Sequence, residues 1–169
     1  MNLISRIFKA VTVEITTPES FIKGEDFEKY VRDFLFPIND YTLIHKTHNY
    51  NSNQEDYIES SLKPDYQFRD KKNGLEFYVE AKWRNGFCNS ENKISWCNPS
   101  QLKRYKEIDK NEAKVFIVLG IGGKPNSPNK IAIFPVSSCN YSQLYYSFID
   151  KNKFYIDKPV FSSYLWNLK

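Results

Sequence analysis

The sequence predicts an α/β fold in which a mixed sheet of about five strands lies between two layers of helices. Three observations predict it. The expected elements follow one another in the order helix, three strands, helix and two strands. Residues 63–84 alternate between apolar and polar side chains around a turn, which is typical of a hairpin. Residues 113–123 form an almost unbroken apolar run, which is typical of a strand buried on both faces.

The first helix is expected over residues 24–36, where apolar residues recur at helical spacing before Pro37. A strand over 41–48 and a polar loop over 49–61 follow it. After the hairpin and an irregular connection, a second helix begins with Asn98 as N-cap and Pro99 at its first position. The last expected elements are strands over 113–123 and 130–136 with a turn at 124–129, a helix over 140–149, and an aromatic tail of uncertain structure.

The composition indicates a soluble globular protein. Its 169 residues are 41% hydrophobic and 17% aromatic, which is too rich in core-forming side chains for a disordered chain. One domain over 1–169 is expected, with a core at about 24–136 and a C-terminal extension over 137–169. The formal net charge of +4 tolerates a polyanion but falls short of the basic stripe of a protein that coats DNA.

Cysteines and histidines are few. Cys88, Cys97 and Cys139 form an odd set without a Cys-x-x-Cys pair, and the chain has 2 histidines, so neither a disulfide framework nor a zinc site is indicated. A reduced cytoplasm is the expected location, because no apolar run near the N-terminus suits a signal sequence or a membrane span. An apolar stripe there is interpreted as packing on the domain, with a membrane-surface anchor as the alternative: Leu3, Ile4, Ile7, Phe8 and Val11.

The hairpin carries an unusual polar face. Successive residues of a strand point to opposite sides, so residues 75–83 divide into an apolar set and a polar set. The polar set is Glu76, Tyr78, Glu80 and Lys82. The strand before the turn divides in the same way, with Asp65, Gln67 and Arg69 in its polar set. Because the apolar sets share a core, the polar sets coincide, and Asp65, Glu80 and Lys82 become neighbours.

The turn leaves two registers open. A loop over 71–74 places Asp65 opposite Glu80. A two-residue turn at 73–74 instead places Asp65 opposite Lys82, in an ordinary cross-strand ion pair. The three residues are neighbours in either register.

Opposed carboxylates point to a metal. They cost roughly 0.2–1 kcal/mol relative to neutral partners, and more when partly buried. A hard dication offsets that cost, since Mg²⁺ prefers carboxylate oxygens, accepts a backbone carbonyl such as that of Ala81 and keeps several waters. Lys82 would lie beside those waters, where its charge favours hydroxide and stabilises negative charge on a phosphate. These residues therefore predict a phosphodiesterase site that uses Mg²⁺, with Mn²⁺ as a substitute.

These residues also carry a family resemblance. Pro64 and Asp65, followed on the next strand by Glu80, Ala81 and Lys82, resemble the motif of the PD-(D/E)XK nuclease superfamily, which has the restriction-endonuclease-like fold. The predicted element order is similar to that of the family's core. The resemblance spans about residues 24–122.

Two helices extend the resemblance. Gly24 and Glu28 resemble the G-x-x-x-E of the family's first helix. Gln101 and Tyr105 resemble the Q-x-x-x-Y that RecB-type and related nucleases carry on the second helix.

The resemblance implies a Mg²⁺-dependent nuclease that acts on DNA. In such an enzyme Asp65, Glu80 and the Ala81 carbonyl would bind the metal, and Glu28 would complete its shell. Lys82 would assist the attacking water, while Gln101 and Tyr105 would orient the substrate or Lys82.

Further residues are expected to contact nucleic acid. They are Arg84, Lys93, Lys103 and Arg104. Trp83 or Trp96 would add stacking. DNA is the expected partner, with RNA as an alternative and no membrane, and cutting of a duplex by one site per chain would suggest a homodimer.

Each site residue also has an ordinary structural interpretation. A Glu-x-Lys sequence is frequent on exposed strands. Glu28 could pair with Arg32 on the helix surface, Gln101 could complete a capping box with Asn98, and Tyr105 could be a core aromatic. For the whole chain, the alternatives are a catalytically silent nucleic-acid-binding or assembly module with the same fold, or a nuclease of RNA.

Overall fold

The computed structural model describes residues 19–47, 62–87 and 92–169. Its main feature is a six-stranded sheet with the order β1-β2-β3-β5-β6-β8. These strands are β1 (Tyr41–Lys46), β2 (Tyr66–Asp70), β3 (Glu76–Arg84), β5 (Lys114–Lys124), β6 (Ser127–Pro135) and β8 (Lys153–Phe154). β3 and β5 run parallel, and the other neighbours are antiparallel, so the predicted mixed sheet is confirmed.

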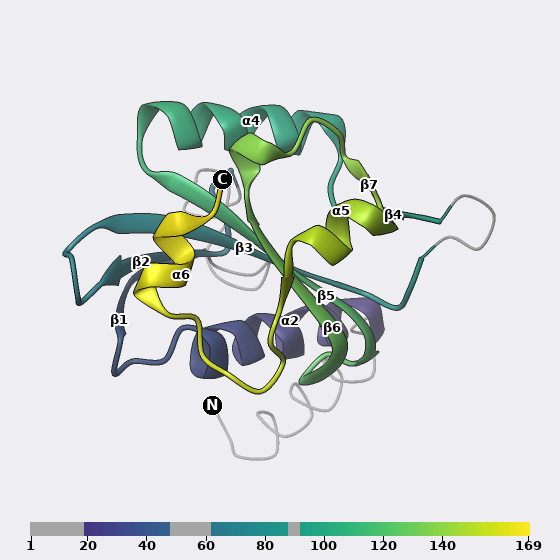
Figure 1. Cartoon of the computed structure of the whole chain (residues 1–169), viewed down its shortest axis with the longest axis horizontal. Coiled ribbons are helices and arrows are strands. Elements are labelled where there is room, and N and C mark those ends of the chain that lie inside the picture. The colour runs from purple at the N-terminus through teal and green to yellow at the C-terminus, as the bar shows by residue number, and fades with distance from the viewer. Residues whose placement is uncertain (1–18, 48–61, 88–91) are drawn as a thin grey trace, which may run out of the picture.

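Helices cover both faces of the sheet, as Figure 1 shows for α2 (Glu19–Tyr30) below it and α4 (Pro99–Asn111) above it. α2 continues into a π-helical turn, η1 (Val31–Leu35). The shorter helical elements are η2 (Val136–Ser138), α5 (Tyr146–Lys151) and α6 (Ser162–Asn167). The three-layer α/β/α architecture predicted from the element order is therefore present. The sheet exceeds the predicted five strands because the two residues of β8 extend its edge beside β6.

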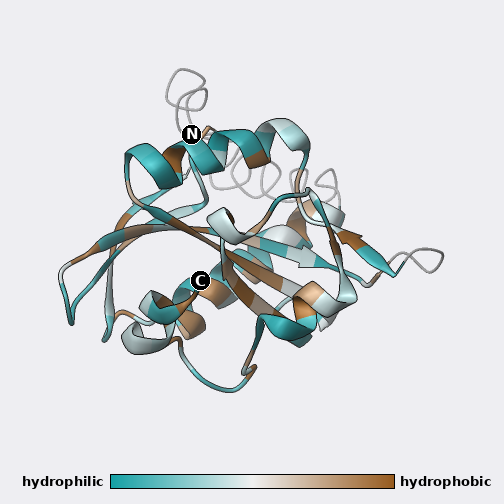
Figure 2. Ribbon diagram, turned by 45° about the horizontal axis from the view of Figure 1, so that its top comes forward, coloured by the Kyte–Doolittle hydropathy of each residue, from teal (hydrophilic) through white to brown (hydrophobic). Residues whose placement is uncertain are grey.

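The core consists of one apolar cluster on each side of the sheet. The cluster on the α2 side includes Phe27, Val31, Phe77 and Val79, and α6 adds Leu165 to it. The cluster on the α4 side includes Leu102, Ile108, Ile117 and Phe134. The central strands are apolar along much of their length, while the exposed sides of the helices are hydrophilic (Figure 2).

Close packing fixes the position of α2. A Cβ atom added to Gly120 of β5 would lie 2.4 Å from a ring carbon of Phe27, so the glycine lets this helix approach the sheet. The helix predicted over 24–36 is confirmed, although it begins earlier, at Glu19, and its last turn is π-helical.

The predicted start of the second helix is also confirmed. The Asn98 side chain accepts a 2.8 Å hydrogen bond from the backbone N–H of Gln101, and Pro99 is the first residue of α4. Asn98 therefore fixes the first turn of the helix.

Two short strands were not predicted. The connection before α4 contains β4 (Lys93–Ser95), which pairs with β7 (Gln143–Tyr145). The helix predicted over 140–149 is therefore wrong in its first half, and α5 takes up only the second half. Ile94 and Leu144 pair with each other in this two-stranded ribbon, and both are buried. A strand of three residues is too short to show an alternating pattern in the sequence, so this contact between distant segments decides the structure. The turn predicted at 124–129 is also shorter, because β6 begins at Ser127.

The C-terminal extension packs on the sheet through its aromatic residues. Trp166 of α6 makes edge contacts with Phe77 and Phe116 at centroid distances of 5.8 and 5.9 Å. The predicted single domain and its boundaries stay predictions. The N-terminal apolar stripe, the loop over 49–61 and Cys88 lie outside the described residues.

Candidate active site

The hairpin adopts the first of the two predicted registers. Arg69 pairs with Glu76 and Tyr66 with Val79, which places Asp65 opposite Glu80 when the pairing is continued by one residue. The turn spans residues 71–74, because the backbone N–H of Asp70 donates to the Leu75 carbonyl at 2.9 Å. The alternative with a two-residue turn is wrong.

Asp65 and Glu80 are joined through the backbone. The N–H of Asp65 donates to Glu80 Oε2 at 3.3 Å, and the N–H of Ala81 donates to Asp65 Oδ2 at 2.8 Å. These bonds hold the two side chains on the same side of the sheet, the side that α4 covers. The predicted juxtaposition of two carboxylates is therefore present.

Glu80 is the centre of the cluster and is 1% exposed. The ammonium group of Lys82 lies 2.5 Å from Glu80 Oε1, and Gln101 Nε2 donates to the same oxygen at 3.1 Å. The Tyr105 hydroxyl donates to Oε2 at 2.7 Å. Together with the Asp65 N–H, four donors surround one buried carboxylate, which offsets the cost of removing it from water.

Helix α4 supplies Gln101 and Tyr105 from one face, since they lie one turn apart. Gln101 Nε2 also lies 2.8 Å from the Tyr105 hydroxyl, so the two side chains support each other. The sequence left open whether Gln101 is only a capping residue. Its backbone takes part in the cap, and its side chain reaches Glu80 instead of returning to Asn98.

The electrostatics reflect a buried cluster of mixed charge. Burial and the nearby charge of Glu80 raise the pKa of Asp65 well above its usual value. Burial alone would lower the pKa of Lys82, but Glu80 and Asp65 outweigh it and raise that pKa. Burial, followed by the charge of Glu80, also raises the pKa of Tyr105. Lys82 therefore keeps its positive charge, and Tyr105 keeps its proton.

Glu28 approaches the cluster from α2. Burial raises its pKa. The positive charge of Lys82 opposes this rise, and the negative charge of Glu80 adds to it. It lines a groove of about 410 Å³ together with Lys82, Trp83 and Gln101. Within residues 19–47, 62–87 and 92–169, no three His, Cys, Asp or Glu side chains form a group arranged to hold a metal, so the role of Glu28 as a ligand stays a prediction.

Comparison with known proteins bears on the fold. No protein-family model matches the chain, and no curated protein matches it. Among solved structures, the chain resembles the 1.6 Å structure of Hjc, a Holliday junction resolvase from the archaeal hyperthermophile Archaeoglobus fulgidus. The match has a TM-score of 0.51 and 14% identity, and it covers 79% of this chain and 92% of the resolvase chain. The chain has a restriction-endonuclease-like fold.

Two of the predicted nucleic-acid-binding residues of this restriction-endonuclease-like fold are arginines that bind backbone carbonyls. The Arg84 guanidinium donates to the carbonyls of Ser95, Trp83 and Trp96 at 2.7, 2.8 and 2.9 Å. Arg104 donates to the Leu62 carbonyl at 2.7 Å. Both arginines thus hold backbone segments near the site.

The remaining predicted contact residues are two lysines and two tryptophans. Lys103 is exposed on α4, and Lys93 lies over the ring of Tyr145. Trp96 is fully buried, so the prediction that it stacks on nucleic acid is wrong, while Trp83 is partly exposed with Lys23 over its ring. The contact between Lys93 and Tyr145 was not predicted, because the alternation of Gln143, Leu144 and Tyr145 is too short to recognise as a strand.

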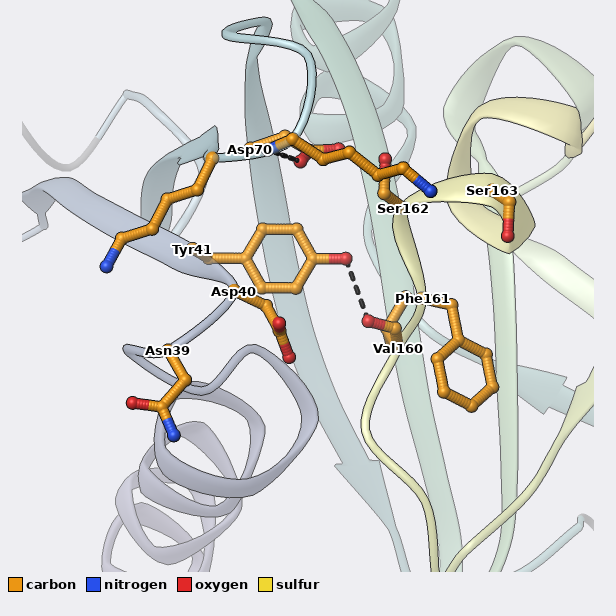
Figure 3. A pocket seen from close by; sticks show the side chains of 10 residues that line it. Asn39, Asp40, Tyr41, Asp70, Val160, Phe161, Ser162 and Ser163 are labelled. Atoms are coloured by element: carbon orange, nitrogen blue, oxygen red, sulfur yellow. Dashed lines mark hydrogen bonds between the residues drawn. The ribbon is translucent and has the colours of Figure 1, made fainter.

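A second cavity, of about 480 Å³, lies between the ends of β1 and β2 and the segment around the start of α6 (Figure 3). The Tyr41 hydroxyl on its wall donates to the Val160 carbonyl at 2.8 Å. The Asp70 carboxylate accepts from the Lys72 N–H and the Trp166 indole, each at 2.8 Å. The bonds with Val160 and Trp166 attach the C-terminal segment to the sheet, which is a structural role.

None of the helices in the described part of the chain is both long and apolar enough to cross a membrane.

Proposed function

We propose that this chain is a divalent-metal-dependent nuclease that hydrolyses DNA phosphodiester bonds. The observation that carries the proposal is the convergence of Asp65, Glu80 and Lys82 on one side of a restriction-endonuclease-like sheet, with Glu80 oriented by Gln101 and Tyr105. The structural resemblance to a Holliday junction resolvase supports a nuclease. It does not by itself carry the substrate over to this chain.

The side chains fit a hard divalent cation. Asp65 and Glu80 offer carboxylate oxygens from adjacent strands, and Mg²⁺ needs few protein ligands because it keeps several of its waters. Asp65, Glu80 and the Ala81 carbonyl would hold the ion, and Glu28 would join them on the α2 side. When bound, Mg²⁺ supplies a water of lowered pKa and positive charge beside the phosphate.

The protein's own residues have separate tasks. The Lys82 ammonium pairs with Glu80, so it would lie beside the bound metal and stabilise negative charge on the phosphate. Gln101 and Tyr105 both donate hydrogen bonds to Glu80, so they act as positioning residues for this carboxylate.

The test is cleavage of plasmid DNA, single-stranded DNA and RNA in Mg²⁺ or Mn²⁺. Glu80→Gln and Lys82→Ala should each lower the cleavage rate at least about 100-fold, because the first removes the charge of a metal ligand and the second removes a positive charge next to the reacting phosphate. Glu76→Gln is the matched control, since Glu76 lies on the same strand and face but pairs with Arg69 at 2.6 Å. Cleavage that persists in Glu80→Gln or Lys82→Ala, with correctly folded protein, contradicts the proposal.

One observation favours a second function, that of a nucleic-acid-binding or assembly module without turnover. Lys82 pairs directly with Glu80, and the four donors around Glu80 satisfy its charge without a metal. Titration calorimetry with Mn²⁺ separates the two functions. Metal uptake that is lost in Glu80→Gln supports the nuclease, while no uptake together with retained DNA binding supports the module.

A further inference from the structure

The ribbon formed by β4 and β7 has one buried and one outward face. Ile94 pairs with Leu144, and both side chains point into the core. Lys93 pairs with Tyr145 and Ser95 with Gln143, so these four side chains share the outward face. In Figure 1 the ribbon lies beside α5 at the edge of the molecule, away from α6.

Two lysine–tyrosine pairs lie on the ribbon and at the start of α5, the element that follows it. The Lys93 ammonium lies 4.9 Å from the centre of the Tyr145 ring. The Lys130 ammonium lies 4.4 Å from the ring of the next residue, Tyr146, and donates to its hydroxyl at 2.9 Å. Tyr145 is 57% exposed and Tyr141, which precedes β7, is 73% exposed. Exposed aromatic rings next to cations form the kind of surface that binds stacked bases and their phosphates.

The ribbon is attached rigidly to the candidate active site. Arg84 lies two residues after Lys82 on β3, and its guanidinium binds the Ser95 and Trp96 carbonyls at the end of β4. The fully buried Trp96 anchors this end, and its indole donates to the Tyr141 carbonyl at 3.2 Å. Two residues later, Asn98 begins the helix that carries Gln101.

These hydrogen bonds hold the β4–β7 ribbon close to the strand that carries Lys82. Lys82 and Arg84 are separated by about 7 Å along the strand, and Lys93 lies about 7 Å beyond Ser95. Ser95, at one end of the outward face, is therefore joined to the strand of Lys82 through the single side chain of Arg84.

We propose that the outward face of the β4–β7 ribbon binds a single-stranded segment of the nucleic-acid substrate, with a base stacked on Tyr145 and the neighbouring phosphates next to Lys93 and Lys130. This inference rests on the proposed nuclease function and names its substrate class. The substrate carries unpaired nucleotides beside the scissile bond. A continuous duplex does not satisfy this surface, because its bases are stacked on one another and cannot stack on a tyrosine.

Binding is measured by fluorescence anisotropy, with labelled single-stranded DNA and with a blunt duplex of the same sequence, in buffer containing EDTA. Tyr145→Ala and Lys93→Ala should weaken binding of the single strand about 5- to 100-fold, as expected for loss of one stacked base or its adjoining charge. Binding of the duplex should change less than about twofold in the same variants. Tyr145→Phe should bind the single strand as the wild type does, because it keeps the ring.

The chain offers a matched control pair. Tyr155 is 61% exposed, and Lys158 lies 4.8 Å from its ring centre, on the segment that follows β8. Tyr155→Ala and Lys158→Ala remove the same chemistry elsewhere on the molecule and should leave binding of the single strand unchanged. Thermal melting verifies that each variant is folded, and Tyr145→Leu replaces Tyr145→Ala if the latter is not.

The outcomes separate this inference from the nuclease proposal. Equal losses in the Tyr145 and Tyr155 variants, or equal losses for single strand and duplex, overturn the ribbon as a single-strand site, whatever the cleavage assay shows. Selective loss in the Tyr145 variant supports it, even if the wild type fails to cleave any substrate and the nuclease proposal falls.

Discussion

Glu80 holds a carboxylate in the interior of the protein, where an unpaired charge costs several kcal/mol. Its donors come from three separate parts of the chain: Lys82 from β3, the Asp65 backbone from the residue before β2, and Gln101 and Tyr105 from α4. An ordinary exposed Glu-x-Lys pair on a strand needs none of these partners. At the scale of single residues, the burial of Glu80 is therefore what distinguishes a built site from a surface ion pair.

Tyr105→Phe tests the positioning of Glu80. It deletes the hydroxyl that donates to Oε2 at 2.7 Å, and it should lower the free energy of unfolding by about 1–3 kcal/mol in urea denaturation. Cleavage should fall in kcat with little change in KM, because Tyr105 orients Glu80 rather than the substrate.

Tyr78→Phe is the control for this variant. Tyr78 lies on β3, the strand of Glu80, but its hydroxyl contacts Lys63 and Glu112, each at 3.2 Å. If Tyr78→Phe and Tyr105→Phe reduce kcat equally, or if Tyr105→Phe changes only KM, the positioning role of Tyr105 is wrong.

At the scale of elements, α4 is placed by its first turn. Asn98→Ala removes the acceptor of the Gln101 N–H and should cost about 0.5–2 kcal/mol of stability, measured by urea denaturation. Because Gln101 and Tyr105 follow on this helix, the rate of cleavage should fall as well. Asn98→Ser keeps a capping oxygen and should restore both properties. A variant that loses stability while cleaving at the wild-type rate would show that the cap does not position the site.

The approach of α2 to the sheet is tested by a pair of glycine variants. Gly120→Ala forces a methyl group against Phe27 and should destabilise the protein by about 1–3 kcal/mol, while displacing the helix that carries Glu28. Gly24→Ala meets no atom within 4 Å and should stabilise α2 by about 0.5–1 kcal/mol. Thermal melting of both variants gives the comparison, and equal melting temperatures would contradict the close packing of α2.

At the scale of the whole molecule, Asp70 ties the C-terminal extension to the hairpin. Burial would raise its pKa, but hydrogen bonds from Ser162 and Trp166 outweigh burial and hold that pKa below the usual value. A carboxylate with a lowered pKa in the folded state stabilises the protein above about pH 4, its pKa when unfolded, and this contribution is lost as pH falls further.

Asp70→Asn should therefore lower the free energy of unfolding by about 1–3 kcal/mol at neutral pH, and the difference from wild type should shrink toward about pH 3. Urea denaturation at both pH values measures it. Asp40→Asn, on the wall of the same cavity, is the control (Figure 3). If the difference in unfolding free energy between Asp70→Asn and wild type stays constant down to pH 3, the ionised carboxylate of Asp70 does not stabilise the protein as described.

The sequence was most informative where local rules act. The alternation of polar residues predicted that Asp65 and Glu80 are neighbours in either register, and an Asn-Pro pair marked the start of α4. It was least informative where contacts distant in the chain decide the structure. Residues 93–95 and 143–145 become strands only by pairing with each other, and Trp96 is buried only because Phe134 and the ribbon close over it. The exposed tyrosines of the ribbon consequently emerged only from the fold.

The central claim, a metal-dependent site between Asp65 and Glu80, is tested most directly by anomalous diffraction from a crystal soaked in Mn²⁺. An anomalous peak is expected within about 2.3 Å of carboxylate oxygens of both residues, and it should disappear in a crystal of Glu80→Gln. Soaked crystals with no peak at these carboxylates, and with Lys82 still paired to Glu80, would contradict this claim.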